Sequence, residues 1–215
     1  MTVADFQLIT LSSVALPIGA AALQWKHLEK APRYLGLFLL FGLLNDVRHH
    51  VPALIEWRAF FIAGYVLCEM LFYVWFIQYA HSTRWDKLWL RAALIFLPLC
   101  WLLSYGGILF HSEEAPSNGI FDVAGSVVII TLASHSLLSL TKVSSYLFSI
   151  ARFWFLTGIL VYFMCSILIF SFVSADFRDD IWFLHGVFDA IKNVLFAMGF
   201  VVARPDTIQR SVQMR

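Results

Sequence analysis

The chain has 215 residues, of which 60% are hydrophobic and only 13% are charged, whereas charged side chains make up about 25% of an average soluble domain. The formal net charge is +1 and no cluster of Lys and Arg occurs, so the composition excludes a nucleic-acid-binding protein. The first residues, MTVADFQLIT, lack the basic segment of a cleaved signal peptide, so we expect the first apolar stretch to stay in the protein.

Seven apolar stretches follow one another along the chain, and each is close to the roughly 20 residues that a transmembrane helix needs. Short polar segments such as KHLEKAPR, HSTRWDK and HSEEAPSNG separate them. The expected spans are 5–25, 32–50, 58–80, 88–110, 119–140, 152–174 and 181–203. The sequence therefore predicts an all-α polytopic membrane protein, with a seven-helix transmembrane domain over residues 1–203 and a short cytoplasmic tail over 204–215.

Basic residues orient the predicted bundle, because cytoplasmic loops of membrane proteins are enriched in Lys and Arg. The first, third and fifth loops and the tail carry Lys26, Lys30, Arg33, Arg84, Lys87, Arg91, Lys142, Arg152, Arg204, Arg210 and Arg215. The opposite side carries only Arg48, Arg58 and Arg178. The pattern predicts an N-terminus outside the cell and a cytoplasmic C-terminus.

The three cysteines, Cys68, Cys100 and Cys165, all lie inside apolar stretches and show no C-x-x-C spacing. We expect them to be small buried side chains and predict no disulfide framework.

The seventh predicted span contains four polar residues, His185, Asp189, Lys192 and Asn193. Their spacing of i, i+4, i+7 and i+8 places all four on one helix face. A charged side chain at mid-bilayer costs about 2.5–3.5 kcal/mol on insertion scales, so this face should point into the bundle.

Two other spans carry polar faces of their own. The third has Tyr65, Glu69 and Tyr73, and the second has Asn45, Asp46, His49 and His50 toward its outer end. With a rise of about 1.5 Å per residue, Lys192 and Glu69 lie at about the same depth, whereas Asp46 and His185 lie nearer the outer surface. The sequence therefore predicts a polar pocket in the outer half of the bundle, with Tyr65, Glu69, His185, Asp189 and Lys192 as its ligand contacts.

Two interpretations of Lys192 follow from this placement. We expect its ammonium to be charged and paired with Glu69, Asp189 or Asp46. Such a pair can be structural and fix the register of the helices. An intramembrane charge is also typical of a ligand or ion site.

A lysine midway along the seventh helix and a carboxylate in the third resemble the arrangement of microbial rhodopsins, in which that lysine binds retinal as a Schiff base. The resemblance implies retinal bound to Lys192. Those proteins place an aspartate four residues before the lysine, whereas Asp189 lies three residues before Lys192. The retinal-pocket patterns of their third and sixth helices are also missing here.

A zinc site is a second alternative, because Asp46, His50, His185 and Asp189 combine the nitrogen and oxygen ligands that zinc accepts. Seven-helix intramembrane hydrolases of the ceramidase and adiponectin-receptor kind use a His-x-x-x-His pair in their last helix. This chain has His185-Gly-Val-Phe-Asp189 in that place, so the second ligand differs.

The segments ARFWFLTGILVYFMCSILIFSF and DDIWFLHGVFDAIKNVLFAMGF resemble the last two helices of small, uncharacterised bacterial seven-helix membrane proteins. More loosely, they are similar to the seven-helix membrane domains of bacterial signalling receptors. The likeness covers residues 151–203, about a quarter of the chain. In the receptors such a domain is fused to a soluble output module. This chain ends in RPDTIQRSVQMR, so we expect any output to pass through a separate protein partner.

These observations together predict a multi-pass protein of the bacterial cytoplasmic (inner) membrane. Its expected function is non-enzymatic, as a ligand-sensing or partner-binding module that contacts membrane lipid and a membrane or cytoplasmic signalling protein. No cofactor is required by this interpretation. The alternatives are a retinal protein, a zinc-dependent intramembrane hydrolase and a small-solute transporter. The last gains no support from internal repeats, since none is evident.

Overall fold

The structure, a computed structural model, describes residues 3–48, 58–79, 84–111, 119–143, 146–172 and 178–203. Within these residues the chain forms seven α-helices and a short 3-10 turn, η2 (Leu147–Ser149). The helices are α1 (Val3–Gln24), α2 (Lys30–Arg48), α3 (Arg58–Tyr79), α4 (Arg84–His111), α5 (Gly119–Val143), α6 (Ala151–Phe172) and α7 (Arg178–Val202). Each helix lies over one of the seven predicted apolar stretches, so the all-α fold is confirmed. The predicted tail, residues 204–215, lies outside the described residues.

Five of these helices contain a segment long and apolar enough to cross a membrane, when only the described side chains are considered. These segments are Phe61–Gln78, Leu88–Tyr105, Phe121–Lys142, Ala151–Ile169 and Phe183–Val202. In α1, whose described side chains begin at Ser12, the apolar segment is Ser12–Gln24, and α2 carries Lys30, Arg33 and Asp46 within its length. The bundle is therefore compatible with a multi-pass integral membrane protein.

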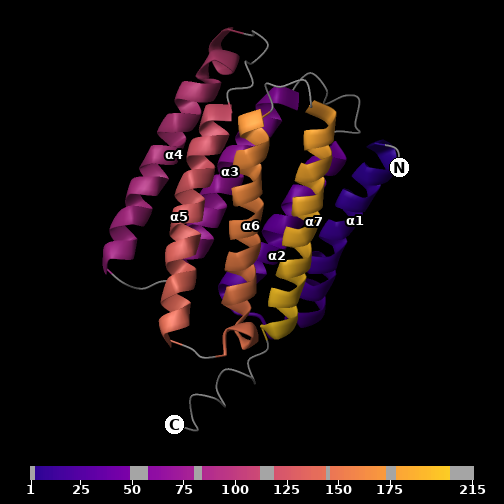
Figure 1. The fold of residues 1–215 in the computed structure, drawn as a ribbon, viewed down its shortest axis with the longest axis vertical. Helices are drawn as coiled ribbons and strands as arrows, with labels where there is room; N and C mark the ends of the chain where they lie inside the picture. The colour runs from indigo at the N-terminus through magenta and orange to yellow at the C-terminus, as the bar shows by residue number, and fades with distance from the viewer. Residues whose placement is uncertain are drawn as a thin grey trace.

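The helices form a closed ring in chain order, because α1 packs against both α2 and α7. Figure 1 shows α4, α5, α6, α7 and α1 side by side, with α2 and α3 behind them. Besides its neighbours α2 and α4, α3 packs against α5. We call the end at which α3, α5 and α7 begin the upper end of the bundle, as it is drawn in Figure 1, and the opposite end the lower end.

The lower half of the bundle is filled by aromatic side chains. The rings of Phe155, Phe196 and Phe200 are fully buried, and Phe155 lies 5.0 Å from Phe200 and 6.1 Å from Phe196 between ring centroids. Two glycines allow this approach: a Cβ on Gly199 would lie 2.5 Å from the Phe155 ring, and one on Gly158 would lie 2.8 Å from the Phe196 ring. Association of membrane helices depends on such close packing, since lipid tails are as apolar as the side chains.

The cysteines differ from the expectation of buried side chains. All three are free thiols; Cys68 is exposed, and Cys100 and Cys165 are partly exposed. The inference failed because a bundle in a membrane places apolar residues on its outside as well as in its core, so an apolar neighbourhood in the sequence does not distinguish the two.

Candidate functional site

The side chain of Lys192 ends at a carboxylate of its own helix. Its Nζ lies 2.5 Å from Asp189 Oδ1, and the Lys192 and Asp189 side chains are 8% and 17% exposed. A separation of three residues puts both on one face of α7, so they pair without help from another helix. The same ammonium lies 4.0 Å from the ring centroid of Tyr162 on α6, which is a cation–π contact. Of the three partners expected for Lys192, namely Glu69, Asp189 and Asp46, the lysine pairs with Asp189.

Asn193 connects this ion pair to α1. The residue is fully buried, and its Nδ2 donates to Ser13 Oγ at 2.9 Å and to Asp189 Oδ2 at 3.2 Å. Both carboxylate oxygens of Asp189 are therefore engaged, one by Lys192 and one by Asn193. The Oδ1 atom of Asn193 is buried, and no donor from the described part of the chain reaches it.

Glu69 lies near the middle of α3 and is 8% exposed. Among the described residues, no hydrogen bond or ion pair reaches its carboxylate. It lies close enough to Lys192 for electrostatic attraction, and close enough to Asp189, Asp46 and Asp122 for repulsion. The sequence-based expectation that Glu69 and Lys192 share a depth agrees with this placement, although the lysine bonds to Asp189 instead.

Two tyrosines of α3 lie on either side of Glu69 along the same helix face. Tyr73 is 1% exposed, and Tyr65 is partly buried. The hydroxyl of Tyr65 reaches the backbone of α2, where a Cβ on Gly42 would lie 2.8 Å from it. Both tyrosines lie within electrostatic range of Glu69. The predicted Tyr65, Glu69 and Tyr73 stripe is thus a buried face of α3.

Two further predicted site residues, Asp46 and His185, lie toward the upper end. Asp46 is exposed on α2, within electrostatic range of Asp189 and Lys192. His185 is partly buried on α7, and its ring lies 5.5 Å from the Tyr162 ring. His50, one of the four candidate zinc ligands, lies outside the described residues. Within the described residues, no group of three or more His, Cys, Asp or Glu side chains could hold a metal ion.

Sequence reasoning missed Tyr162, Asp122 and Tyr105. Tyr162 lies in the apolar run VYFMC, and only the rotation of α6 places its ring under Lys192. Asp122 is buried in the first turn of α5, within interaction range of Tyr105 of α4. A single carboxylate inside the apolar stretch of the fifth span was the signal that could have identified Asp122.

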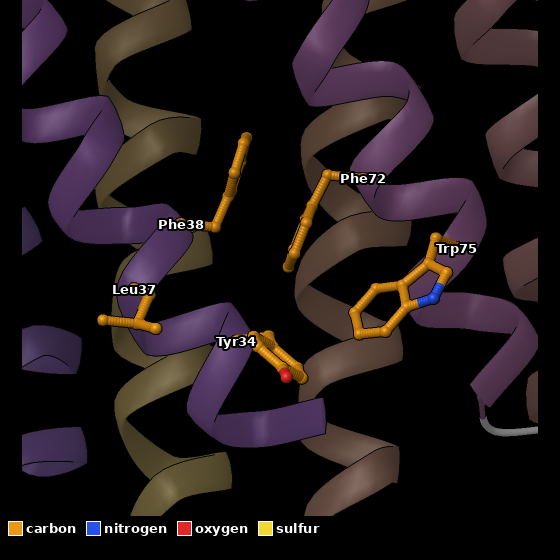
Figure 2. Close-up of a pocket in the computed structure, with 5 residues that line it drawn as sticks. All are labelled: Tyr34, Leu37, Phe38, Phe72 and Trp75. Carbon is orange, nitrogen blue, oxygen red and sulfur yellow. The ribbon is translucent and has the colours of Figure 1, made fainter. Parts of the chain in front are cut away.

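An apolar groove of about 410 Å³ lies between α2 and α3, and the ring of Phe38 in its lining lies 6.1 Å from that of Tyr65 and 5.9 Å from that of Tyr73 between centroids. Figure 2 shows its lining, with the rings of Phe38 and Phe72 facing each other across the two helices. These rings are nearly parallel, at 6°, with centroids 4.1 Å apart. Tyr34, Leu37 and Trp75 complete the lining and are all exposed. The groove is therefore part of the outer apolar surface of the bundle.

We name Glu69, Tyr162, Asp189, Lys192 and Asn193 the polar cluster. Its members come from α3, α6 and α7 and lie near the middle of those helices. The cluster can hold positive charge between carboxylates and an aromatic ring. Comparisons of the chain with protein families, with curated proteins and with solved structures found no match, so the likeness drawn from residues 151–203 rests on the sequence alone.

Proposed function

We propose that this chain is a seven-span protein of the bacterial inner membrane that senses a small ligand, proton or ion through the polar cluster, without catalysing a reaction. The N-terminus and the upper end would face outward. The basic residues described at the lower end support this orientation, since Lys26, Lys30, Arg33, Lys142 and Arg152 all lie there. A separate membrane or cytoplasmic protein would receive the signal.

The observation that carries the proposal is the buried Glu69 carboxylate, which lies beside a lysine already bonded to Asp189. A buried charge without a partner is costly, so neutralising Glu69 changes the energy of the cluster. A bound cation or proton would do this and would also release Lys192 from the attraction of Glu69. Because the cluster has members on α3, α6 and α7 and is bonded to α1 through Ser13, its rearrangement would alter how these helices pack.

The lower half favours sensing over transport. Beneath the polar cluster the interior contains the buried rings of Phe76, Phe155, Phe196 and Phe200, which pack on one another. Ring centroid distances of 5.0 to 5.7 Å among Phe76, Phe155 and Phe200 match direct aromatic contact. A solute that reached the cluster from the upper end would meet this packed layer, whereas a signal needs only a change in helix packing.

Hydrogen exchange of the full chain in lipid nanodiscs tests the proposal. Glu69→Gln removes the unpaired carboxylate, so we expect slower amide exchange in α3 and α7. Lys192→Met leaves the carboxylates without their cation, so we expect faster exchange in the same helices. Glu29→Gln and Lys30→Met, at exposed positions of the lower end, are the matched controls. Wild-type exchange in both cluster variants, with any cellular phenotype intact, would leave the cluster no sensing role.

The cofactor alternatives have their own measurements. A visible absorption band that hydroxylamine bleaches, in protein purified with added retinal, would assign Lys192 to a Schiff base. One bound zinc per chain, lost on His185→Ala, would favour a hydrolase. We expect a colourless, metal-free protein.

A further inference from the structure

The polar cluster already shows how it holds an alkylammonium group. The Lys192 ammonium lies 2.5 Å from Asp189 Oδ1 on one side and 4.0 Å from the Tyr162 ring centroid on another. A carboxylate and an aromatic face together recognise ammonium groups, the first through a charge-assisted hydrogen bond and the second through its quadrupole. Here the ammonium belongs to the chain itself.

A second carboxylate with tyrosine neighbours lies on α3. Glu69 has Tyr65 one turn before it and Tyr73 one turn after it, and both lie within its electrostatic range. Glu69 is nine-tenths buried, yet no Lys, Arg or His of the described chain forms an ion pair with it. Glu69 thus resembles Asp189 in having tyrosine neighbours, but the nearby Lys192 ammonium is bonded to Asp189 and not to Glu69.

The charges and hydrogen bonds of the cluster also favour an incoming cation that donates N–H bonds. Three carboxyl groups, those of Asp46, Asp122 and Asp189, lie within electrostatic range of Glu69, and so does the ammonium of Lys192. The fully buried Asn193 adds an Oδ1 atom that accepts no hydrogen bond from the described residues.

We infer that Glu69 and its tyrosine neighbours bind a small organic ammonium cation, so that the cluster contains two ammonium groups when the ligand is present. A metal ion fits less well, because the described residues offer no set of three metal ligands. Asp46, exposed toward the upper end, would attract the cation to the cluster. This inference rests on the proposed sensing function and names its ligand class.

Ethylammonium chloride is the probe that tests the inference, titrated into the detergent-purified full chain at constant ionic strength. We expect a saturable rise in Tm, followed by tryptophan fluorescence, with an apparent Kd of about 1 mM for so small a ligand. Glu69→Gln should weaken binding by about tenfold or more, because a charge-assisted hydrogen bond is lost. Glu29→Gln, which removes an exposed carboxylate at the lower end, should leave the Kd unchanged.

Sodium and potassium chloride, titrated in the same way, separate an organic cation from a metal ion. An equal saturable response to either salt, an unchanged Kd in Glu69→Gln, or no saturable response to ethylammonium would each overturn the ammonium assignment. The hydrogen-exchange experiment decides the sensing role separately. If hydrogen exchange is altered in Glu69→Gln but the wild-type protein does not bind ethylammonium, only the ligand class is wrong. If the wild-type protein binds ethylammonium but exchange in Glu69→Gln is unaltered, only the sensing function is wrong.

Discussion

The polar cluster and the aromatic lower half are both buried, but they are held together by different forces. A ring such as Phe155 contacts only its immediate neighbours, so its contribution depends on local shape. A charge such as Lys192 acts on every carboxylate within several ångströms, because the interior screens it weakly. The stability lost by a substitution in the lower half should therefore depend only on that position. The stability lost by a charge change in the polar cluster should be partly restored by a second charge change at another position.

Loss of the lysine is the largest effect that we expect. Lys192→Met leaves Asp189 and Glu69 without a neighbouring cation, and removing one partner of a buried ion pair costs about 3–5 kcal/mol of the free energy of unfolding. Equilibrium unfolding of the detergent-solubilised protein in SDS measures this loss. Ile191→Met, which places the same side chain one residue earlier at a position that is 40% exposed, should change little. Equal stability of the two variants would contradict a structural role for the pair.

A cavity in the lower half comes next. Phe155→Ala should cost about 2–4 kcal/mol, less than in a soluble protein, because the unfolded helix stays in an apolar environment and mainly the packing contacts are lost. The control is Phe148→Ala, whose ring is 71% exposed. The same unfolding assay measures both variants. If Phe148→Ala loses as much free energy of unfolding as Phe155→Ala, the packed rings of the lower half do not contribute to stability.

A double-mutant cycle tests the contrast itself. Adding Glu69→Gln to Lys192→Met removes one of the carboxylates left without a cation, so we expect about 1–3 kcal/mol of stability to return. Added to Phe155→Ala, Glu69→Gln should change the stability only by as much as it does alone, with the two effects additive to within about 0.5 kcal/mol. If both pairs were additive, Glu69 and Lys192 would not interact and the difference between the two regions would disappear.

The smallest effect concerns the hydrogen bond between α1 and α7. Ser13→Ala removes the acceptor of the 2.9 Å bond from Asn193 Nδ2, which should cost about 1 kcal/mol. Ser139→Ala is the matched control, since that hydroxyl bonds to the His135 carbonyl of its own helix at an exposed site. If the unfolding curves of the two variants coincide, the bond between α1 and α7 contributes no more stability than the bond within α5.

The helices were predictable from the sequence because long apolar stretches between short polar segments admit few other structures. Their polar faces were predictable as well, since the spacing of His185, Asp189 and Lys192 fixes one side of α7. Counting residues along each helix predicted that Glu69 and Lys192 lie at the same depth. In the structure both lie near the middle of their helices and within electrostatic range of each other.

The partner of Lys192 was not predictable. Asp189 is three residues away on the same helix, while Glu69 and Asp46 come from other helices, and sequence spacing gives no distance between helices. Tyr162 was missed for a related reason, because the rotation of α6 decides which of its aromatic residues faces α7. The approach of Tyr105 to Asp122 likewise depends on how α4 and α5 meet.

The position of Asp189 on the same helix as Lys192 has a consequence for how the protein is made. α7 follows six other helices in the chain, and in a bilayer a lone lysine at its centre would oppose insertion by about 2.5–3.5 kcal/mol. Because Asp189 lies on the same helix as Lys192, α7 carries its own counter-charge and would insert into a bilayer with this pair neutral overall. The bond from Asn193 to Ser13 joins residues 180 positions apart and forms only when α7 docks on α1. During biogenesis, charge compensation can therefore precede closure of the ring.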